Sequence, residues 1–327
     1  MRAIVQDTYG STEVLKLGEI DPPEVGNDEV LVRVRAAGLD RGVWHMMAGL
    51  PLMIRVMGFG FRGPKIRVPG YDFAGRVAAV GKNAKRFEIG EEVFGIGSGS
   101  FAEYICARED RLEPKPTNLS LEQAAAVPTS ALTALQGLRD HGKIEAGQKV
   151  LIIGASGGVG TFAVQVAKAF GAVVTGVCRT AKVEMVRTIG ADHVIDYKHD
   201  DFLQRDQRYD LILDIGGNRS LSQLRRVLTP RGTLVIIGGE EGGRWLGGTD
   251  RMLRVFLLSP FVRQNLRAFV AKSNKADLQL LKELIESGKV RPVIDRTFPL
   301  NEAPEALRYL EEGRARGKVI VTVKTST

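Results

Sequence analysis

A glycine-rich turn joins a predicted buried strand to a predicted amphipathic helix in the middle of the chain. The strand covers residues 149–153, the turn covers 154–157, and the apolar periodicity of a helix covers 159–170. Ser156 and Gly157 lack bulk, so the backbone can approach a pyrophosphate, while the first turn of the helix presents free N–H groups to an anion. The pattern predicts a dinucleotide-binding site, with a tight turn that binds no ligand as the alternative.

The residues after the next predicted strand, 173–177, distinguish between two dinucleotides. A carboxylate there would accept a hydrogen bond from the ribose 2′-hydroxyl of NAD and repel a 2′-phosphate. This chain has Arg179 and Lys182 and no acid between 178 and 182. Because a guanidinium and an ammonium attract a phosphate, we expect NADPH as the cofactor. The alternative is that both side chains are solvated surface charges.

The elements that must position these residues fall into two parts. From residue 2 to about 117, short β-branched runs broken by Gly and Pro predict an antiparallel β domain. From about 121, strands alternate with helical stretches, which is typical of parallel βαβ units and of an α/β fold. After about 271 a helix, a strand, a second helix and a further strand follow.

Composition narrows the classes of protein. The 327 residues are enough for two domains, and 44% hydrophobic with 26% charged residues is typical of a globular protein. The sequence has no basic and apolar leader and no apolar run of about 18 residues, so we expect the cytoplasm. Two cysteines are too few for a four-cysteine zinc site. The net charge of +8 is dispersed and lacks an aromatic and basic motif, so no nucleic-acid partner is expected.

The glycine turn is one of several motifs that occur in a fixed order. The others are Gly38-Leu39-Asp40, PGYDFAGRVAAVG at 69–81, GEEVFG at 90–95, GSFAEY at 99–104, AAAVPTSALTAL at 124–135 and GADHVIDY at 190–197. Together they resemble the medium-chain dehydrogenase/reductase superfamily over essentially the whole chain, and within it the zinc-independent quinone oxidoreductases and the reticulon-interacting mitochondrial oxidoreductases. The resemblance implies a GroES-like β domain, residues 1–125 and 272–327, and a Rossmann domain with a doubly wound parallel sheet, residues 126–271.

The resemblance also implies which residues contact the cofactor. The pyrophosphate would be held by the turn of Ser156, Gly157, Gly158, Val159 and Gly160, the 2′-phosphate by Arg179, Lys182 and Tyr197, the nicotinamide half by Thr133 and Gly238, and the β domain would contribute Arg314, Ala315 and Arg316. The alternatives are strand-end packing for Tyr197 and a solvated charge for Arg316. Relatives commonly form homodimers through the last strand of the sheet, which falls near 266–270 in this chain.

The same resemblance places Asp40 and Tyr71 where zinc-dependent members have a Cys and a His ligand. Hard or aromatic oxygens do not form the nitrogen and sulfur site that zinc prefers, so no metal is expected. Without a Lewis acid, oxidation of an ordinary alcohol lacks the group that stabilises its alkoxide. A conjugated acceptor instead spreads the charge of an added hydride onto oxygen.

We therefore expect NADPH-dependent, zinc-independent reduction of quinones or α,β-unsaturated carbonyls. Asp40, Trp44 and Tyr71 are the candidates for the substrate pocket, with a packing role as the alternative for each. A second functional hypothesis is an NADPH-binding protein that acts through protein contacts with little catalysis.

Two stretches, 53–67 and 251–275, combine large apolar residues with basic ones and contain no acid. Because an exposed apolar patch is unusual unless it binds something, we expect them to form an apolar entrance with a basic rim for a small lipophilic acceptor. The alternative is that the first packs on the β core and the second in a dimer interface. An extension of the hypothesis is peripheral contact with an anionic membrane.

Overall fold

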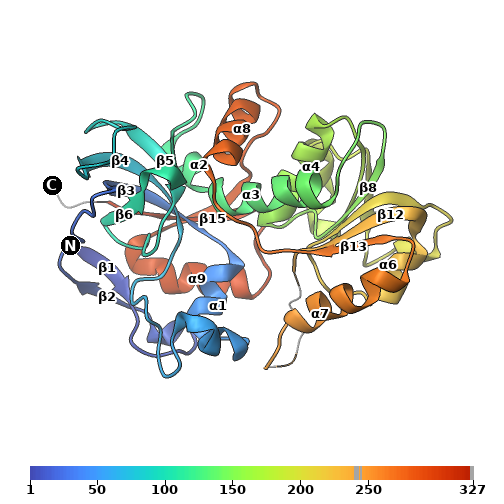
Figure 1. Cartoon of the computed structure of the whole chain (residues 1–327), viewed down its shortest axis with the longest axis horizontal. Helices are drawn as coiled ribbons and strands as arrows, with labels where there is room; N and C mark the ends of the chain where they lie inside the picture. Colours follow the sequence, from blue (N-terminus) through green and yellow to red (C-terminus); the bar gives the residue numbers. More distant parts are fainter. Residues whose placement is uncertain (239–242, 244, 325–327) are drawn as a thin grey trace. The chain divides into compact units, whose positions relative to one another are not determined.

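The computed structural model describes residues 1–238, 243 and 245–324, and the chain divides into two compact units (Figure 1). Unit 1 comprises Met1–Ser130, Ser273–Ser287 and Pro292–Thr327, and unit 2 comprises Ala131–Lys272 and Gly288–Arg291. The boundary predicted after residue 125 lies shortly before the first division, which follows Ser130. None of the helices among the described residues is long and apolar enough to cross a membrane.

Unit 2 is built on a parallel sheet. Its strands are β8 (Lys149–Ile153), β9 (Val173–Cys178), β10 (His193–Asp196), β11 (Tyr209–Asp214), β12 (Leu228–Ile236) and β13 (Asn265–Ala268). The strand order β10-β9-β8-β11-β12-β13, with every neighbouring pair parallel, is that of a doubly wound sheet. The predicted Rossmann sheet is confirmed.

Helices cover both faces of this sheet, so the apolar runs of its inner strands are buried. The helices are α3 (Pro128–Gln136), which crosses the division between the units, α4 (Gly158–Ala169), α5 (Val183–Thr188), α6 (Leu221–Arg226) and α7 (Thr249–Leu258). Figure 1 shows α4 on one side of the sheet, with α6 and α7 on the other. The predicted alternation of strands and helices in this part of the chain is confirmed.

Unit 1 is a β domain to which both ends of the chain contribute. Its main sheet runs in the order β14 (Ile294–Pro299), β15 (Lys318–Thr322), β3 (Glu29–Leu39), β4 (Asp72–Val80), β5 (Glu92–Ile96) and β7 (Leu112–Pro114), while β6 (Tyr104–Arg108) also pairs with β3, and β1 (Arg2–Val5) pairs with β2 (Lys16–Glu19). All these pairs are antiparallel except β14 with β15. The helices are α1 (Arg41–Ala48), α2 (Leu121–Ala125), α8 (Lys275–Glu286) and α9 (Ala303–Glu311), with a π-helical turn at Arg55–Phe59. The predicted β domain is confirmed.

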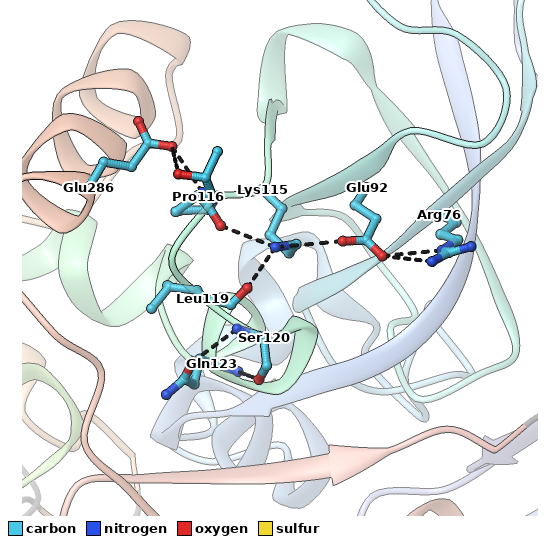
Figure 2. A network of polar contacts seen from close by, with 9 residues as sticks. Arg76, Glu92, Lys115, Pro116, Leu119, Ser120, Gln123 and Glu286 are labelled. Atoms are coloured by element: carbon cyan, nitrogen blue, oxygen red, sulfur yellow. Dashed lines mark hydrogen bonds and ion pairs between the residues drawn. The ribbon is translucent and has the colours of Figure 1, made fainter.

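Polar contacts fasten the segment after β7 to the sheet of unit 1 (Figure 2). The Lys115 ammonium donates to the carbonyl oxygens of Pro116 and Leu119 at 3.1 and 2.6 Å and lies 3.6 Å from the Glu92 carboxylate. Glu92 also pairs with Arg76 at 3.0 Å. A half-buried cation thus satisfies carbonyl groups that no strand or helix pairs.

A buried ion pair connects three distant segments of unit 1. Asp72, at the start of β4, and Lys318, at the start of β15, are 0% and 1% exposed, and their charged groups lie 3.5 Å apart. The Thr129 backbone N–H donates to Asp72 Oδ1 at 3.0 Å, and Lys318 Nζ donates to Ser130 Oγ at 3.1 Å. Since Thr129 and Ser130 lie in the first turn of α3, the pair holds α3, β4 and β15 together.

Burial sets the protonation of this pair. It raises the pKa of Asp72 to about 7, with Lys318 opposing the shift. The same carboxyl ionises near pH 4 in an unfolded chain, so the folded state holds the extra proton between those values. This group therefore lowers the free energy of unfolding as the pH rises from about 4 to about 7.

We predict that Lys318→Met destabilises the protein more at pH 8 than at pH 5. At pH 8 most of the native Asp72 carboxyl is ionised and paired. In the variant, which lacks the cation that lowers its pKa, the carboxyl must bind a proton or stay buried as an unpaired carboxylate, which costs up to about 3 to 5 kcal/mol, whereas at pH 5 the carboxyl is neutral in both proteins. Urea unfolding at the two pH values measures the difference. The matched control, Asp72→Asn with Lys318→Met, removes both charges and should be less sensitive to pH. An equal loss of stability at both pH values would contradict the prediction.

Candidate functional site

The glycine turn forms an open cradle at the N-terminus of α4. Gly157 caps the helix in an extended conformation, and the N–H groups of Gly158, Val159 and Gly160 lie in its first turn, where a helix supplies no acceptor. A Cβ added at Gly157 would meet only one atom within 4 Å, at 3.6 Å, so space beside the turn is open. The neighbouring Ser156 is buried. These donors and this space fit a pyrophosphate.

Two close approaches explain glycine at positions 160 and 176. A Cβ on Gly160 would lie 2.1 Å from the carbonyl oxygen of Gly154, and Gly154 itself has a φ of +88°. A Cβ on Gly176, in β9, would lie 2.7 Å from Cγ1 of Val186 and 3.1 Å from the Cβ of Ala155. The first turn of α4 therefore lies against the backbone of the glycine turn, and β9 leaves room for the side chains of the turn and of α5.

The corner after β9 carries the residues predicted to bind a 2′-phosphate. Arg179 is exposed and its Nε donates to the Tyr197 hydroxyl at 3.3 Å, while the Lys198 ammonium lies 5.8 Å from the centre of the Tyr197 ring. Lys182 follows in the next turn and is half-buried. The structure thus brings Arg179 and Tyr197 together in one exposed basic corner.

An acid that the sequence analysis did not weigh also lies at this corner. Asp196 ends β10, beside Cys178 in the sheet register. Its carboxylate accepts a hydrogen bond from the Lys198 backbone N–H at 3.0 Å, and a hydrogen bond from the Thr180 side chain, with smaller contributions from other groups, lowers the pKa of Asp196. Since protein donors already engage this carboxylate, it is less available to a ribose hydroxyl.

The other residues assigned to the cofactor belong to both units. Thr133 is buried in α3, and Gly238 follows β12, where a Cβ would lie 2.3 Å from the carbonyl oxygen of Ile215. Residues 314–316 lie in unit 1, where the Asp295 carboxylate accepts a hydrogen bond from the Arg316 backbone N–H at 3.1 Å. Ala315 is buried and the two arginines are exposed. The cofactor roles of these residues stay predictions.

Unit 1 contains a cavity of about 230 Å³ with a mostly apolar wall. Its lining comprises Gln6, Tyr9, Met46, Gly58, Phe59, Pro64, Lys65, Ile66, Val68, Pro69, Gly70 and Tyr71. Lys65 is the one Lys or Arg among these residues, and no acid is present among them. The composition suits a lipophilic molecule with one polar end.

Tyr71 is the one predicted substrate residue in this lining. Burial, together with the nearby Asp40 carboxylate, raises the pKa of Tyr71 to about 12, so the hydroxyl stays protonated and can donate a hydrogen bond. Asp40 caps α1 by accepting from the Val43 backbone N–H at 3.3 Å, and its Oδ2 is buried with no partner among the described residues. Trp44 packs against the core of unit 1. Asp40 and Trp44 are close in sequence to Met46, which lines the cavity, but they are not lining residues themselves.

The two apolar and basic stretches differ in the structure. In residues 53–67, Phe59 lines the cavity whereas Phe61 is exposed outside it. In residues 251–275, Arg251 is buried and its guanidinium lies 2.6 Å from the buried Asp214 carboxylate, so the expectation that this arginine contributes to a basic rim is wrong. The Asp214 and Arg251 pair was not predicted, although an acid that ends the apolar strand β11 was a usable signal.

The described residues do not offer a zinc site. No group of three or more His, Cys, Asp or Glu side chains is placed to hold one metal ion within the described part of the chain. Asp40 and Tyr71, which align with zinc ligands by resemblance, supply only oxygen atoms, a poor match for zinc. The side chains at these positions therefore do not fit a zinc ion.

Known proteins resemble both units. The family model described as alcohol dehydrogenase GroES-like domain matches residues 26–117, and the model described as zinc-binding dehydrogenase matches residues 189–321. The mitochondrial NAD(P)H oxidoreductase RTN4IP1 of Bos taurus is 34% identical, over 99% of this chain and 89% of that protein. The chloroplastic NADPH-dependent alkenal/one oxidoreductase of Arabidopsis thaliana is also 34% identical, over 98% of this chain and 79% of that protein.

A solved structure agrees with these matches in both fold and extent. The quinone oxidoreductase from Coxiella burnetii superimposes with a TM-score of 0.87 at 30% identity, and the match covers 99% of each chain. Sequence and structure comparisons therefore cover the same two units. The chain belongs to the medium-chain dehydrogenase/reductase superfamily of oxidoreductases, which use a nicotinamide cofactor.

Proposed function

We propose that this protein reduces quinones or α,β-unsaturated carbonyls with NADPH and without zinc. The observation that carries the proposal is the cavity of unit 1, whose lining is mostly apolar, contains no acid and includes Tyr71, a residue whose raised pKa keeps its hydroxyl neutral. The names of its relatives support the same chemistry, since they include a quinone oxidoreductase and an NADPH-dependent alkenal/one oxidoreductase.

The residues of unit 2 would hold the cofactor. The pyrophosphate fits the N–H groups of Gly158, Val159 and Gly160, and a 2′-phosphate fits the basic corner of Arg179 and Lys182. When bound, NADPH supplies a hydride, which carries the two electrons of the reduction. The protein must then position the acceptor and stabilise the oxygen on which negative charge develops.

Tyr71 is suited to that second task. Its hydroxyl stays protonated at neutral pH because burial raises its pKa to about 12. It can donate a hydrogen bond to a quinone or enone oxygen, and the proton that completes the reduction comes from this hydroxyl or from water. The apolar lining formed by Phe59, Ile66 and Val68 would meanwhile exclude bulk water from the acceptor.

Three further properties stay predictions of ours. A homodimer would extend the sheet of unit 2 through β13, which is the last strand in the sheet order. The expected cytoplasmic location has no support from the two relatives named above, because one is described as mitochondrial and the other as chloroplastic. Nucleic acid is not an expected partner.

The activity is tested by following NADPH oxidation with a panel of quinones and enones, and NADP⁺ reduction with saturated alcohols. We expect turnover of the conjugated acceptors, no turnover of the alcohols, and no effect of a chelator. Metal analysis should find no stoichiometric zinc. One zinc per chain, or alcohol oxidation that the chelator stops, would overturn the proposal. NADPH binding without turnover of any acceptor would favour a protein that acts through protein contacts.

Cofactor choice gives a second prediction. NADPH should bind at least about tenfold more tightly than NADH, because losing charge-assisted contacts to the 2′-phosphate costs on the order of 1.4 kcal/mol or more. Arg179→Gln should remove most of this difference by weakening NADPH binding alone, as measured by titration calorimetry. Arg187→Gln, an exposed arginine of α5 that pairs with Glu184, is the matched control. Equal dissociation constants for the two cofactors in the native protein would refute the prediction.

The cavity gives a third prediction, on acceptor length. Phe59→Ser should lower kcat/KM for a long-chain quinone about tenfold while changing that for a short, water-soluble quinone much less, because it removes apolar area that only the long chain contacts. Ile89→Ser is the matched control, since Ile89 is 69% exposed and outside the cavity lining. If Phe59→Ser affects both quinones equally, the cavity does not hold the acceptor chain.

A further inference from the structure

Large apolar side chains project from the loop of residues 56–62 in unit 1. Val56, Met57 and Phe61 are 67%, 66% and 73% exposed, and Phe59, at 40%, reaches from the same loop into the cavity lining. So many exposed large apolar side chains in one short loop are unusual in a protein surface unless they bind something.

The base of this loop is fixed by hydrogen bonds. The Lys65 backbone N–H donates to the Phe59 carbonyl oxygen at 2.9 Å, which closes the loop. The Tyr9 hydroxyl donates to the carbonyl oxygens of Phe59 and Gly60 at 3.1 and 2.8 Å, and the Arg55 guanidinium lies 4.4 Å from the centre of the Tyr9 ring. The exposed side chains therefore stand on an anchored base, which limits the conformational entropy lost when they dock.

The charge around the loop is positive. The sequence from residue 41 to residue 71 contains five Lys or Arg residues and no Asp or Glu. Of the acids that contact this segment, Asp7 is paired with Arg67 at 2.7 Å, and Asp40 accepts a hydrogen bond from the Val43 backbone N–H at the start of α1. Arg62 lies directly beside the exposed Phe61, and Lys65 lies at the base of the loop.

Apolar side chains beside uncompensated cations match an anionic lipid surface. Such a surface offers phosphate oxygens to the cations and an acyl boundary to the apolar groups in one plane. A second copy of this chain would bring the same positive loop, and a protein of net charge +8, against itself, so like charges oppose that occupant.

We propose that the loop of residues 56–62 docks this protein on the surface of an anionic phospholipid bilayer. Val56, Met57 and Phe61 enter the boundary between headgroups and acyl chains, and Arg62 contacts lipid phosphates. Phe59 and Lys65 belong both to this segment and to the cavity lining, so a lipophilic acceptor dissolved in the bilayer has a short path to the cavity. The delivery of the acceptor rests on the proposed function, whereas the docking does not.

Vesicle sedimentation with the full chain tests the docking without any assay of activity. We expect binding to vesicles of phosphatidylcholine with about 30 mol% phosphatidylglycerol, weaker binding as the salt concentration rises, and little binding to phosphatidylcholine alone. No binding to the anionic vesicles at about 0.1 M salt, or equal binding to both vesicle types, would overturn the proposal.

Variants then assign the binding to the loop. Arg62→Gln should lower the partition coefficient about fivefold, and Met57→Ser with Phe61→Ser about tenfold or more, because they remove a lipid-facing charge and buried apolar area respectively. The matched controls in the same unit are Lys85→Gln and Ile89→Ser, which change an exposed cation and a 69% exposed apolar residue. Thermal unfolding confirms that each variant is folded. Equal partition coefficients for loop variants and controls would show that another surface binds the lipid.

Discussion

The buried contact between Asp72 and Lys318 is the constraint on which the arrangement of unit 1 depends. It joins the first residue of β4, the first residue of β15 and, through Thr129 and Ser130, the start of α3. Tyr71 directly precedes Asp72, so the pair also fixes the backbone at a residue that lines the cavity. Two charges are expensive to bury, and they are retained where their geometry restrains several segments at once.

Two central strands of the parallel sheet of unit 2 could be predicted almost to the residue. The predicted strands at 149–153 and 173–177 coincide with β8 and β9, because a strand buried on both faces is largely apolar and is bounded by glycine or polar residues. The glycine turn was equally predictable, since Gly160 stands where its Cβ would lie 2.1 Å from a carbonyl oxygen. Such features depend on local sterics and on local apolar patterns, so they can be predicted from a single sequence.

The polar core of each unit could not be predicted in the same way. Asp72 and Lys318 are far apart in the sequence, as are Asp214 and Arg251, and no local pattern states that they meet. Arg251 is an example. Its own stretch of sequence has no acid, so it was expected to be a surface cation, but its partner Asp214 comes from a distant segment. The cavity was unpredictable for the same reason, since Gln6, Met46 and Tyr71 converge on it from separate segments.

The basic corner and the apolar cavity belong to different units. The basic corner of Arg179 and Tyr197 belongs to unit 2, whereas the apolar cavity and the exposed loop of residues 56–62 belong to unit 1. Groups that share no partner contribute to binding nearly independently. If the proposed function holds, we expect cofactor choice and acceptor choice to be separable in this chain: a charge changed at the corner should alter which dinucleotide binds, and an apolar residue changed at the cavity should alter which acceptor binds, each with little effect on the other.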